Sequence, residues 1–305
     1  MGARPLLHVG YHKTATSWMQ NLLFVPEHGY RKIADHSDAF EHIIGPHGLS
    51  FDPSFMRRHI AKAMENINPG EVPVISSEIL SGHPFFGGVN SDVYAHRLAL
   101  IAPDARILIS IRSQMKILPS VYMQYLLRGG TMTPAQFFSG ETELGYFAFR
   151  PQHFEYDRLI RLYQSLFGAE NVHVLTQESL KADMDAAAAR LAKFCDNTVF
   201  AGLNPSARQV YAPGYPEFEV PVLRRVNHVQ RSVLNPNPMI SLGTTPKGLY
   251  RACGGILRRL PFAHLLDKHR PVSAYVAKQF ASYFSASNAR LAELVGKDVD
   301  LSDYG

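Results

Sequence analysis

The chain has 305 residues, of which 46% are hydrophobic and 19% are charged, and its formal net charge is +5. This composition is typical of a globular protein, and the length suits one sizeable α/β domain or two small ones. No segment approaches the roughly 20 consecutive apolar residues of a membrane-spanning helix. The first apolar run is too short for a signal peptide, and the two cysteines predict neither disulfides nor a metal site. We therefore expect a cytoplasmic protein.

The positive charge is concentrated between residues 221 and 271. This segment has one acid, Asp267, and nine basic residues, so its net charge is +8. The basic residues are Arg224, Arg225, Arg231, Lys247, Arg251, Arg258, Arg259, Lys268 and Arg270. Such an excess indicates an anionic ligand, an acidic acceptor or a membrane surface, or else a solvated basic face. No nucleic-acid-binding motif accompanies it, so we expect no nucleic-acid partner.

Four short, mostly apolar runs predict the strands of a parallel sheet. They are Pro5–Val9, Val72–Ser76, Arg106–Ile111 and Asn171–Leu175. Helical patterns lie between or after them, over Ser17–Phe24, Phe55–Asn66, Asp92–Ile101, Leu118–Leu127, His153–Phe167 and Leu180–Phe194. This alternation predicts an α/β fold with a doubly wound, mainly parallel sheet and flanking helices.

The composition changes beyond Cys195. Residues 197–250 are rich in Pro, Gly and Asn, and the clearest break in helical pattern is Asn235-Pro236-Asn237-Pro238. One long helix is predicted to close the chain, over Val272–Val295. We expect a single domain over residues 1–305, in which residues 1–196 form the α/β core and residues 197–305 form a loop-rich, mostly helical C-terminal cap on the substrate side.

The first predicted strand leads into an anion-binding loop, Gly10-Tyr11-His12-Lys13-Thr14-Ala15-Thr16-Ser17. A helix that starts there presents unpaired N–H groups and the positive end of its dipole to a phosphate-like group. Gly10 permits a tight turn and Lys13 adds a positive charge. The hydroxyl donors are Thr14, Thr16 and Ser17. The Walker A pattern, Gly-x4-Gly-Lys-[Ser/Thr], is absent, which disfavours a P-loop small-molecule kinase.

This loop resembles the 5′-phosphosulfate loop of sulfotransferases that use 3′-phosphoadenosine 5′-phosphosulfate (PAPS), commonly Lys-Thr-Gly-Thr-[Thr/Ser]. The chain has Ala15 where glycine is common. The resemblance implies a P-loop-like sulfotransferase fold, PAPS as donor and 3′-phosphoadenosine 5′-phosphate (PAP) as product. It also implies that Lys13 contacts the bridging oxygen of the donor. The implied donor-binding residues are Gly10, Lys13, Thr14, Ala15, Thr16 and Ser17.

A second anchor is predicted at the end of the third strand. In the same family an arginine at a strand end and a serine eight positions later hold the 3′-phosphate, and Arg112 and Ser120 have this spacing. A guanidinium fork and a hydroxyl both suit a phosphate. Pro119 predicts that the helix begins or kinks beside Ser120. Relatives often add a basic residue before a glycine in a late loop, for which Lys247-Gly248 is the candidate, with Arg258 and Arg259 as alternates.

Glu78 is the candidate catalytic base. It follows the second predicted strand, at the edge of the sheet where α/β proteins bind ligands. The resemblance agrees with this role, because glycan sulfotransferases commonly use a glutamate, whereas those that act on small phenols or alcohols usually use a histidine. His12 is expected to assist, and the charge of Lys13 should lower its pKa. His12 and His83 are the rival bases.

The predicted reaction is the in-line transfer of a sulfuryl group from PAPS to a hydroxyl or amine, without a metal ion. The basic segment and the glutamate favour a saccharide or glycolipid acceptor, anionic or lipid-linked, with peripheral membrane contact. A small hydroxylated metabolite is the alternative acceptor. A P-loop kinase and a non-catalytic nucleotide-binding module are the alternative functions, and the sequence leaves the oligomeric state open.

Overall fold

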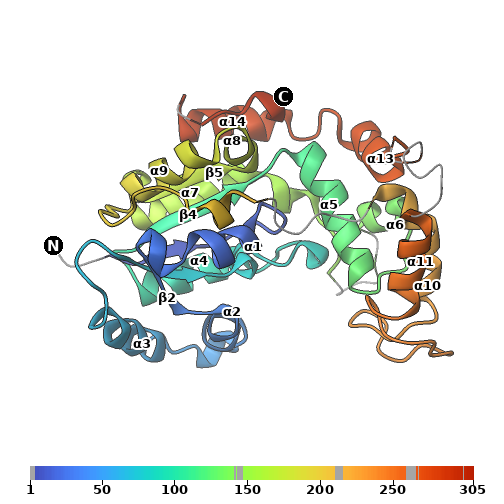
Figure 1. Cartoon of the computed structure of the whole chain (residues 1–305), viewed down its shortest axis with the longest axis horizontal. Helices are drawn as coiled ribbons and strands as arrows, with labels where there is room; N and C mark the ends of the chain where they lie inside the picture. Colours follow the sequence, from blue (N-terminus) through green and yellow to red (C-terminus); the bar gives the residue numbers. More distant parts are fainter. Residues whose placement is uncertain are drawn as a thin grey trace.

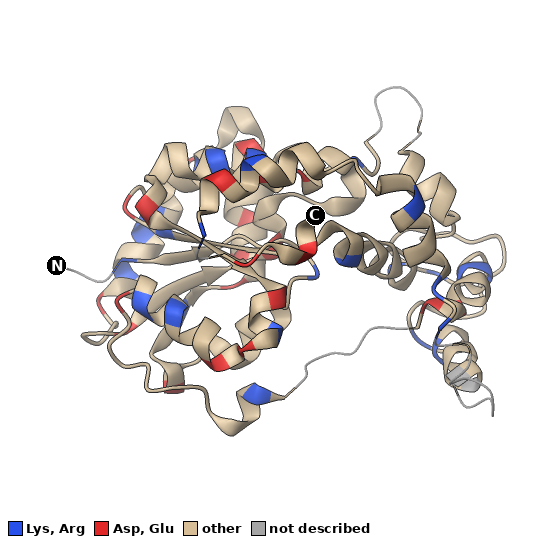
Figure 2. Cartoon of the chain, turned by 90° about the horizontal axis from the view of Figure 1, so that it is seen from above, with Lys and Arg blue, Asp and Glu red and all other residues tan. Residues whose placement is uncertain are grey.

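The computed structural model describes residues 4–140, 142, 147–209, 216–258, 266, 268–297 and 299–305. Its centre is a five-stranded parallel sheet with the strand order β2-β3-β1-β4-β5. The strands are β1 (Leu6–His8), β2 (Tyr30–Ala34), β3 (Val72–Ser76), β4 (Arg106–Ile111) and β5 (Val172–Thr176). Helices lie on both sides of this sheet (Figure 2). The predicted doubly wound α/β fold is confirmed.

The central strand, β1, is buried on both faces, which explains its uninterrupted apolar sequence. Leu7 lies in register with Ile75 of β3 and with Ile107 of β4. His8 is the polar exception, and its ring nitrogens lie 2.7 Å from Ser76 Oγ and 3.0 Å from Ser110 Oγ. Burial lowers the pKa of His8 to about 4, so the ring is neutral near pH 7 and links the three central strands.

One of the two edge strands, β2, was not predicted. Arg31 and Lys32 interrupt its apolar pattern, because this strand pairs only with β3 and exposes part of its length. Its pairing also shifts register between Lys32 and Ala34. Strand β2 therefore lacks the continuous apolar run by which the other four strands, including β5 at the opposite edge, were found.

Two hydrophobic layers cover the sheet (Figure 1). One contains helix α1 (Thr16–Trp18) with the following π-helical turn Met19–Leu23, α8 (Gln177–Ala182) and α9 (Met184–Phe194). The other contains α3 (Ser54–Met64), α4 (Ser91–Ile101) and α7 (Tyr156–Phe167). The predicted helix Leu180–Phe194 is two helices, because Asp183 leaves the helical conformation and caps α9 by accepting a hydrogen bond from Ala186 N at 2.9 Å.

A long helix, α5 (Gln114–Leu127), connects the sheet to a second lobe (Figure 1). Helices α10 (Val220–Asn227) and α11 (Leu249–Arg258) pack there around Leu223, Val226 and Tyr250. We call residues 220–258 the α10–α11 lobe. The smaller helices α2 (His36–Ala39) and α6 (Pro134–Ser139) contribute Ala39, Phe137 and Phe138 to the main hydrophobic core.

The end of the chain returns to the α/β core. The single closing helix predicted over Val272–Val295 is wrong, because the structure has α13 (Pro271–Phe280) on α5 and α14 (Ser285–Val295) on α7. Phe280 and Leu291 join the main hydrophobic core. The division at residue 196 stays a prediction. Within the described ranges, no helix is long and apolar enough to cross a membrane.

Candidate functional site

Three adjacent strands bring the predicted catalytic and binding residues together. The loops after β3, β1 and β4 carry Glu78, Lys13 and Arg112, and these strands are neighbours in the sheet. Burial lowers the pKa of the Lys13 ammonium, Arg112 lowers it further, and Glu78 partly offsets both effects. Lys13 therefore lies within electrostatic range of both Arg112 and Glu78 at the carboxyl edge of the sheet, where α/β proteins bind ligands.

A buried hydrogen-bond network connects the loop from Gly10 to Ser17 with strands β1 and β4. Thr14 Oγ1 donates to the carbonyl of Tyr11 at 2.5 Å and lies 2.7 Å from Ser110 Oγ. Ser110 in turn contacts His8. The hydroxyl of Thr14 is thus hydrogen-bonded within the protein. Thr14 can therefore contact a ligand through its backbone groups. Thr16 is also buried, whereas Ser17 is exposed.

The loop needs left-handed backbone at two non-glycine residues. Lys13 has φ +64° and Ala15 has φ +67°, a region that costs residues with a Cβ about 1 kcal/mol or more. Ala15 therefore adopts the conformation that favours the glycine of the resembling loops. Such turns direct N–H groups to one side and form anion-binding concavities. Among the described residues, the N–H groups of Lys13 and Ala15 donate to no protein acceptor.

Arg112 and Ser120 come together as predicted. Arg112 Nη1 donates to Ser120 Oγ at 2.9 Å and lies 3.5 Å from the carbonyl oxygen of Lys13. Arg112 Nε is buried and has no partner in the described part of the chain, which leaves a donor for an anion. The helix does not begin beside Ser120, because α5 starts at Gln114 and contains Pro119. Tyr156 supports the strand end by donating to the carbonyl of Arg112 at 2.7 Å.

Two glutamines complete the site and were not predicted. Gln20 Nε2 donates to a carboxylate oxygen of Glu78 at 3.1 Å, and Lys13 Nζ donates to Gln124 Oε1 at 3.4 Å. Each glutamine lies four residues after a predicted site residue, Thr16 or Ser120. Residues at that spacing share a helix face, so the helical period could have identified both.

His12 and His83 lie beside this site, with their ring centroids 5.8 Å apart. Burial lowers the pKa of His12 to about 3, and His83, His36, Lys13 and Arg128 add smaller effects. The predicted influence of Lys13 therefore has the right direction but is secondary to burial. Burial also lowers the pKa of His83 to about 4. Both rings are neutral near pH 7, and His12 Nδ1 is buried without a partner among the described residues.

A pocket of about 270 Å³ opens beside the first loop. Tyr11, Ser91, Gln152 and His153 contribute to its wall. Burial lowers the pKa of His153 to about 3, and the neighbouring His12 and His83 lower it further. Its Nε2 atom is buried without a partner in the residues described. Gly88 leaves room for this ring, because a Cβ there would lie 2.2 Å from His153 Nδ1.

Lys247 and Gly248 are not brought to Arg112. Both lie in the α10–α11 lobe, where Lys247 N donates to the carbonyl of Thr244 at 2.7 Å. The lobe packs near the end of α5 that is distant from Arg112, and 14 helical residues span about 21 Å. Arg259, Asp267 and the Arg258 side chain lie outside the described residues. Within the described ranges, no three His, Cys, Asp or Glu side chains form a metal-binding group.

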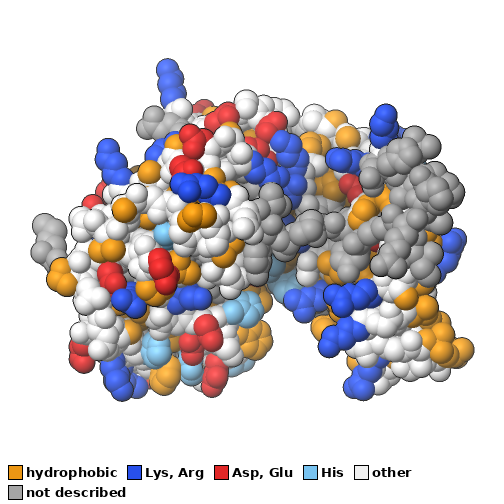
Figure 3. Space-filling model, viewed as in Figure 1, with side chains coloured by type: hydrophobic (Ala, Val, Ile, Leu, Met, Phe, Trp, Pro, Cys, Tyr) orange, Lys and Arg blue, Asp and Glu red, His pale blue; other side chains and the backbone are white. Residues whose placement is uncertain are grey.

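The surface is hollowed between the α/β core and the α10–α11 lobe (Figure 3). Histidine side chains lie on the core side of the hollow, and Lys and Arg side chains lie on the lobe side.

The sequence matches no known family model, and no curated protein is significantly similar to it. Among solved structures, the fold is similar to the crystal structure of a sulfotransferase from Alicyclobacillus acidocaldarius, with a TM-score of 0.52 and 16% sequence identity. The similarity covers 98% of this chain and 98% of that chain. At this identity the likeness concerns the fold alone. The chain therefore has a sulfotransferase-like α/β fold along nearly its whole length.

Proposed function

We propose that the protein is a PAPS-dependent sulfotransferase. The observation that carries this proposal is the position of Arg112, which contacts both Ser120 and the carbonyl of Lys13. Two anion-binding elements therefore meet at the ends of β1 and β4. A donor with a 3′-phosphate and a 5′-phosphosulfate needs two such elements, whereas an ordinary adenine nucleotide needs only the phosphate loop. Arg112 Nε, which has no partner among the residues that the structure describes, fits the 3′-phosphate.

In the proposed reaction the bound donor supplies the sulfuryl group. Glu78 takes the proton of the acceptor hydroxyl as its oxygen bonds to sulfur, and the bond from sulfur to the 5′-phosphate oxygen breaks. Lys13 stabilises the negative charge that develops on that phosphate oxygen. Gln20 holds the Glu78 carboxylate, while Arg112 and Ser120 orient the donor. PAP and the sulfated acceptor leave.

The proposed acceptor is a saccharide or a glycolipid. The pocket beside Tyr11 has polar groups from Ser91, Gln152 and His153, and its volume of about 270 Å³ is close to the lower limit of about 300 Å³ for small-molecule sites. This size suits one sugar unit. His153 contributes to the wall of this pocket as a neutral imidazole, because burial lowers its pKa. Its proposed role is to position the acceptor while Glu78 takes the proton.

Single-turnover transfer from PAPS to saccharides and simple alcohols tests the proposed function. Wild-type protein should form a sulfated product, Glu78→Gln should not, and both should bind PAP. Glu65→Gln is the matched control, because Glu65 is exposed at the end of α3. Normal turnover by Glu78→Gln would show that Glu78 is not the base. No transfer from PAPS, together with phosphoryl transfer from ATP–Mg²⁺, would show that the protein is a kinase.

A further inference from the structure

The α10–α11 lobe displays large apolar side chains to solvent. Val233 is 75% exposed, Met239 104%, Ile240 62% and Leu242 57%. We call these four residues the apolar tip; they lie within the loop between α10 and α11. Single exposed apolar residues are ordinary, but a cluster of them marks an interaction surface.

The base of this loop is firmly built, so the exposure of its tip is not a consequence of poor packing. Arg231 N donates to the carbonyl of Gly243 at 2.8 Å, and Thr245 N donates to the carbonyl of Arg231 at 2.9 Å. Thr245 Oγ1 then donates to Asn227 Oδ1 at 2.9 Å. Asn227 is fully buried, and its Nδ2 donates to Leu126 O at the end of α5 at 2.9 Å. The loop is thus fixed to the core and holds its apolar side chains away from it.

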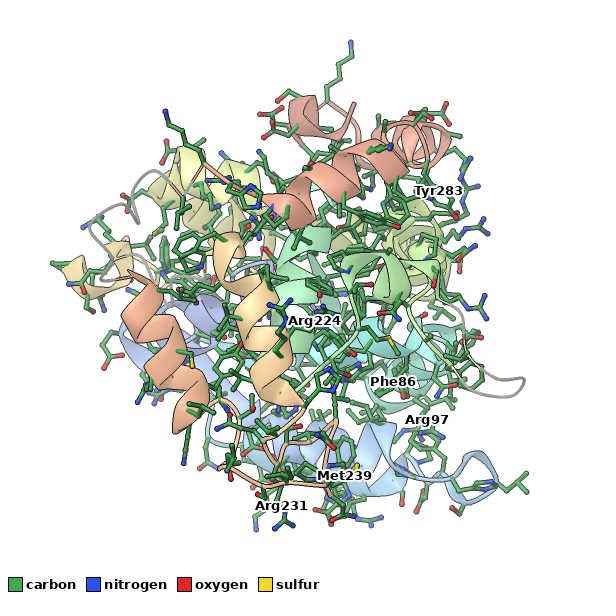
Figure 4. The ribbon with its side chains drawn as sticks, turned by 90° about the vertical axis from the view of Figure 1, so that its right-hand side faces the viewer. Phe86, Arg97, Arg224, Arg231, Met239 and Tyr283 are labelled. Atoms are coloured by element: carbon green, nitrogen blue, oxygen red, sulfur yellow. The ribbon has the colours of Figure 1, made fainter. Side chains whose placement is uncertain are left out.

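The charged residues of the lobe that carries the apolar tip are all basic. Residues 220–258 contain no Asp or Glu and six basic residues, Arg224, Arg225, Arg231, Lys247, Arg251 and Arg258. Arg225, Arg231, Lys247 and Arg251 are exposed, and in the described structure none of these four forms an ion pair. Figure 4 shows Arg231 and Met239 at the same end of the lobe.

We propose that the apolar tip and the basic residues around it dock the protein on an anionic lipid surface. Apolar side chains insert at the boundary between headgroups and acyl chains, and nearby cations attract anionic headgroups. The charge favours this partner over a second copy of the chain, because contact between two such lobes would bring twelve basic residues and no acid together. If the proposed function holds, docking places the hollow beside the lobe near lipid-linked acceptors.

Vesicle co-sedimentation tests this proposal. The wild-type protein should sediment with vesicles of phosphatidylcholine and phosphatidylglycerol, and much less with phosphatidylcholine alone. Replacing the apolar tip by Met239→Ser, Ile240→Ser and Leu242→Ser together should weaken binding about tenfold or more. Arg231→Ala should weaken vesicle binding about fivefold and make that binding less sensitive to salt. The matched controls are Leu49→Ser, at a side chain that is 95% exposed on the core, and Arg161→Ala on α7; both should bind as wild type does.

Absence of vesicle binding, or equal binding to both vesicle types, would overturn the proposal. Sedimentation velocity provides a second measurement. A dimer of the wild-type protein that the triple serine variant abolishes would assign the apolar tip to a second copy. PAP binding by the same samples separates this proposal from the proposed function, because a protein that binds vesicles but not PAP would refute only the function. Retained PAP binding also shows that each variant is folded.

Discussion

Gly10 lies directly against the backbone of Glu78. A Cβ atom on Gly10 would be 2.8 Å from both Cα and the carbonyl oxygen of Glu78, and the φ of Gly10 is +98°. The absence of a side chain at Gly10 therefore allows the loop that contains Lys13 and the proposed base, Glu78, to approach each other. Because the obstacle is backbone, a local side-chain movement cannot relieve it.

Gly10→Ala should consequently lower the free energy of unfolding by about 2 kcal/mol or more. It should also weaken PAP binding, because the loop must move away from Glu78. Denaturant unfolding and calorimetry check the two effects. Gly48→Ala is the matched control, since Gly48 has no positive φ and no atom within 4 Å of an added Cβ. Equal stability of the two variants would show that Gly10 is not constrained as described.

Ala15→Gly should have the opposite effect on stability. Ala15 has φ +67°, and glycine adopts this conformation without the cost of a Cβ. We expect the free energy of unfolding to rise by about 0.5–1 kcal/mol, with PAP binding retained. In contrast, Ala189→Gly on the exposed face of α9 should lower the free energy of unfolding by about 1 kcal/mol. A loss of stability in Ala15→Gly would contradict the assigned backbone conformation.

Ser120→Ala removes the neighbour that orients Arg112. The hydrogen bond from Arg112 Nη1 to Ser120 Oγ is 2.9 Å long, and bonds to charged groups contribute about 1.5–3 kcal/mol. PAP binding should therefore weaken about tenfold or more, while ADP binding should change little. Calorimetric titration measures both ligands. The control Ser165→Ala, at an exposed serine of α7, should leave the affinities for PAP and ADP unchanged. If Ser120→Ala weakened PAP and ADP binding equally, the 3′-phosphate would have to bind elsewhere.

The stability of the protein should fall in mild acid because His153 is buried and neutral. Its pKa is lowered from 6.5 to about 3, so the unfolded chain takes up a proton that the folded protein does not. The stabilisation is complete above pH 6.5 and is lost as the pH falls towards 3. His153 alone should contribute a loss of about 2 kcal/mol between about pH 7.5 and about pH 5.

Urea unfolding of His153→Gln at these two pH values checks this contribution. The variant should lose less stability on acidification than the wild type. His96→Gln, at an exposed histidine of α4, should retain the wild-type difference. An unchanged pH dependence in His153→Gln would mean that His153 is protonated at an ordinary pKa.

The sequence predicts the parts of the fold that repeat a simple pattern. Strands β1, β3, β4 and β5 were found because their residues are mostly buried and apolar. Strand β2 was not predicted, because Arg31 and Lys32 lie at an exposed edge and interrupt its apolar pattern. The break between α8 and α9 was not predicted, because the helical propensity of the alanine-rich sequence outweighed the signal of the cap at Asp183. Propensity describes each residue by itself, whereas a cap depends on one side chain bonding to a neighbouring backbone group.

The residues of the candidate site were likewise predicted only in part. Glu78 was nominated from its position after a strand, Lys13 from its loop and the sulfotransferase resemblance, and Arg112 from that resemblance; the strand order places their loops side by side. His153 could not be recognised, because it reaches the site only through tertiary packing against Tyr11, at a centroid distance of 4.9 Å. Lys247 was nominated by analogy with a late loop, and the structure leaves it in the α10–α11 lobe because its backbone bonds are made there.

Calorimetric titration with PAP tests the central claim most directly, with ADP and ATP–Mg²⁺ as comparison ligands and Arg112→Ala as the variant. The wild-type protein should bind PAP much more tightly than ADP, and Arg112→Ala should remove most of that difference, while Arg161→Ala on α7 should preserve it. This result would establish recognition of the 3′-phosphate beside the Lys13 loop. Preference for ATP–Mg²⁺, or equal binding of PAP and ADP by the wild type, would contradict the assignment of the protein as a PAPS-dependent sulfotransferase.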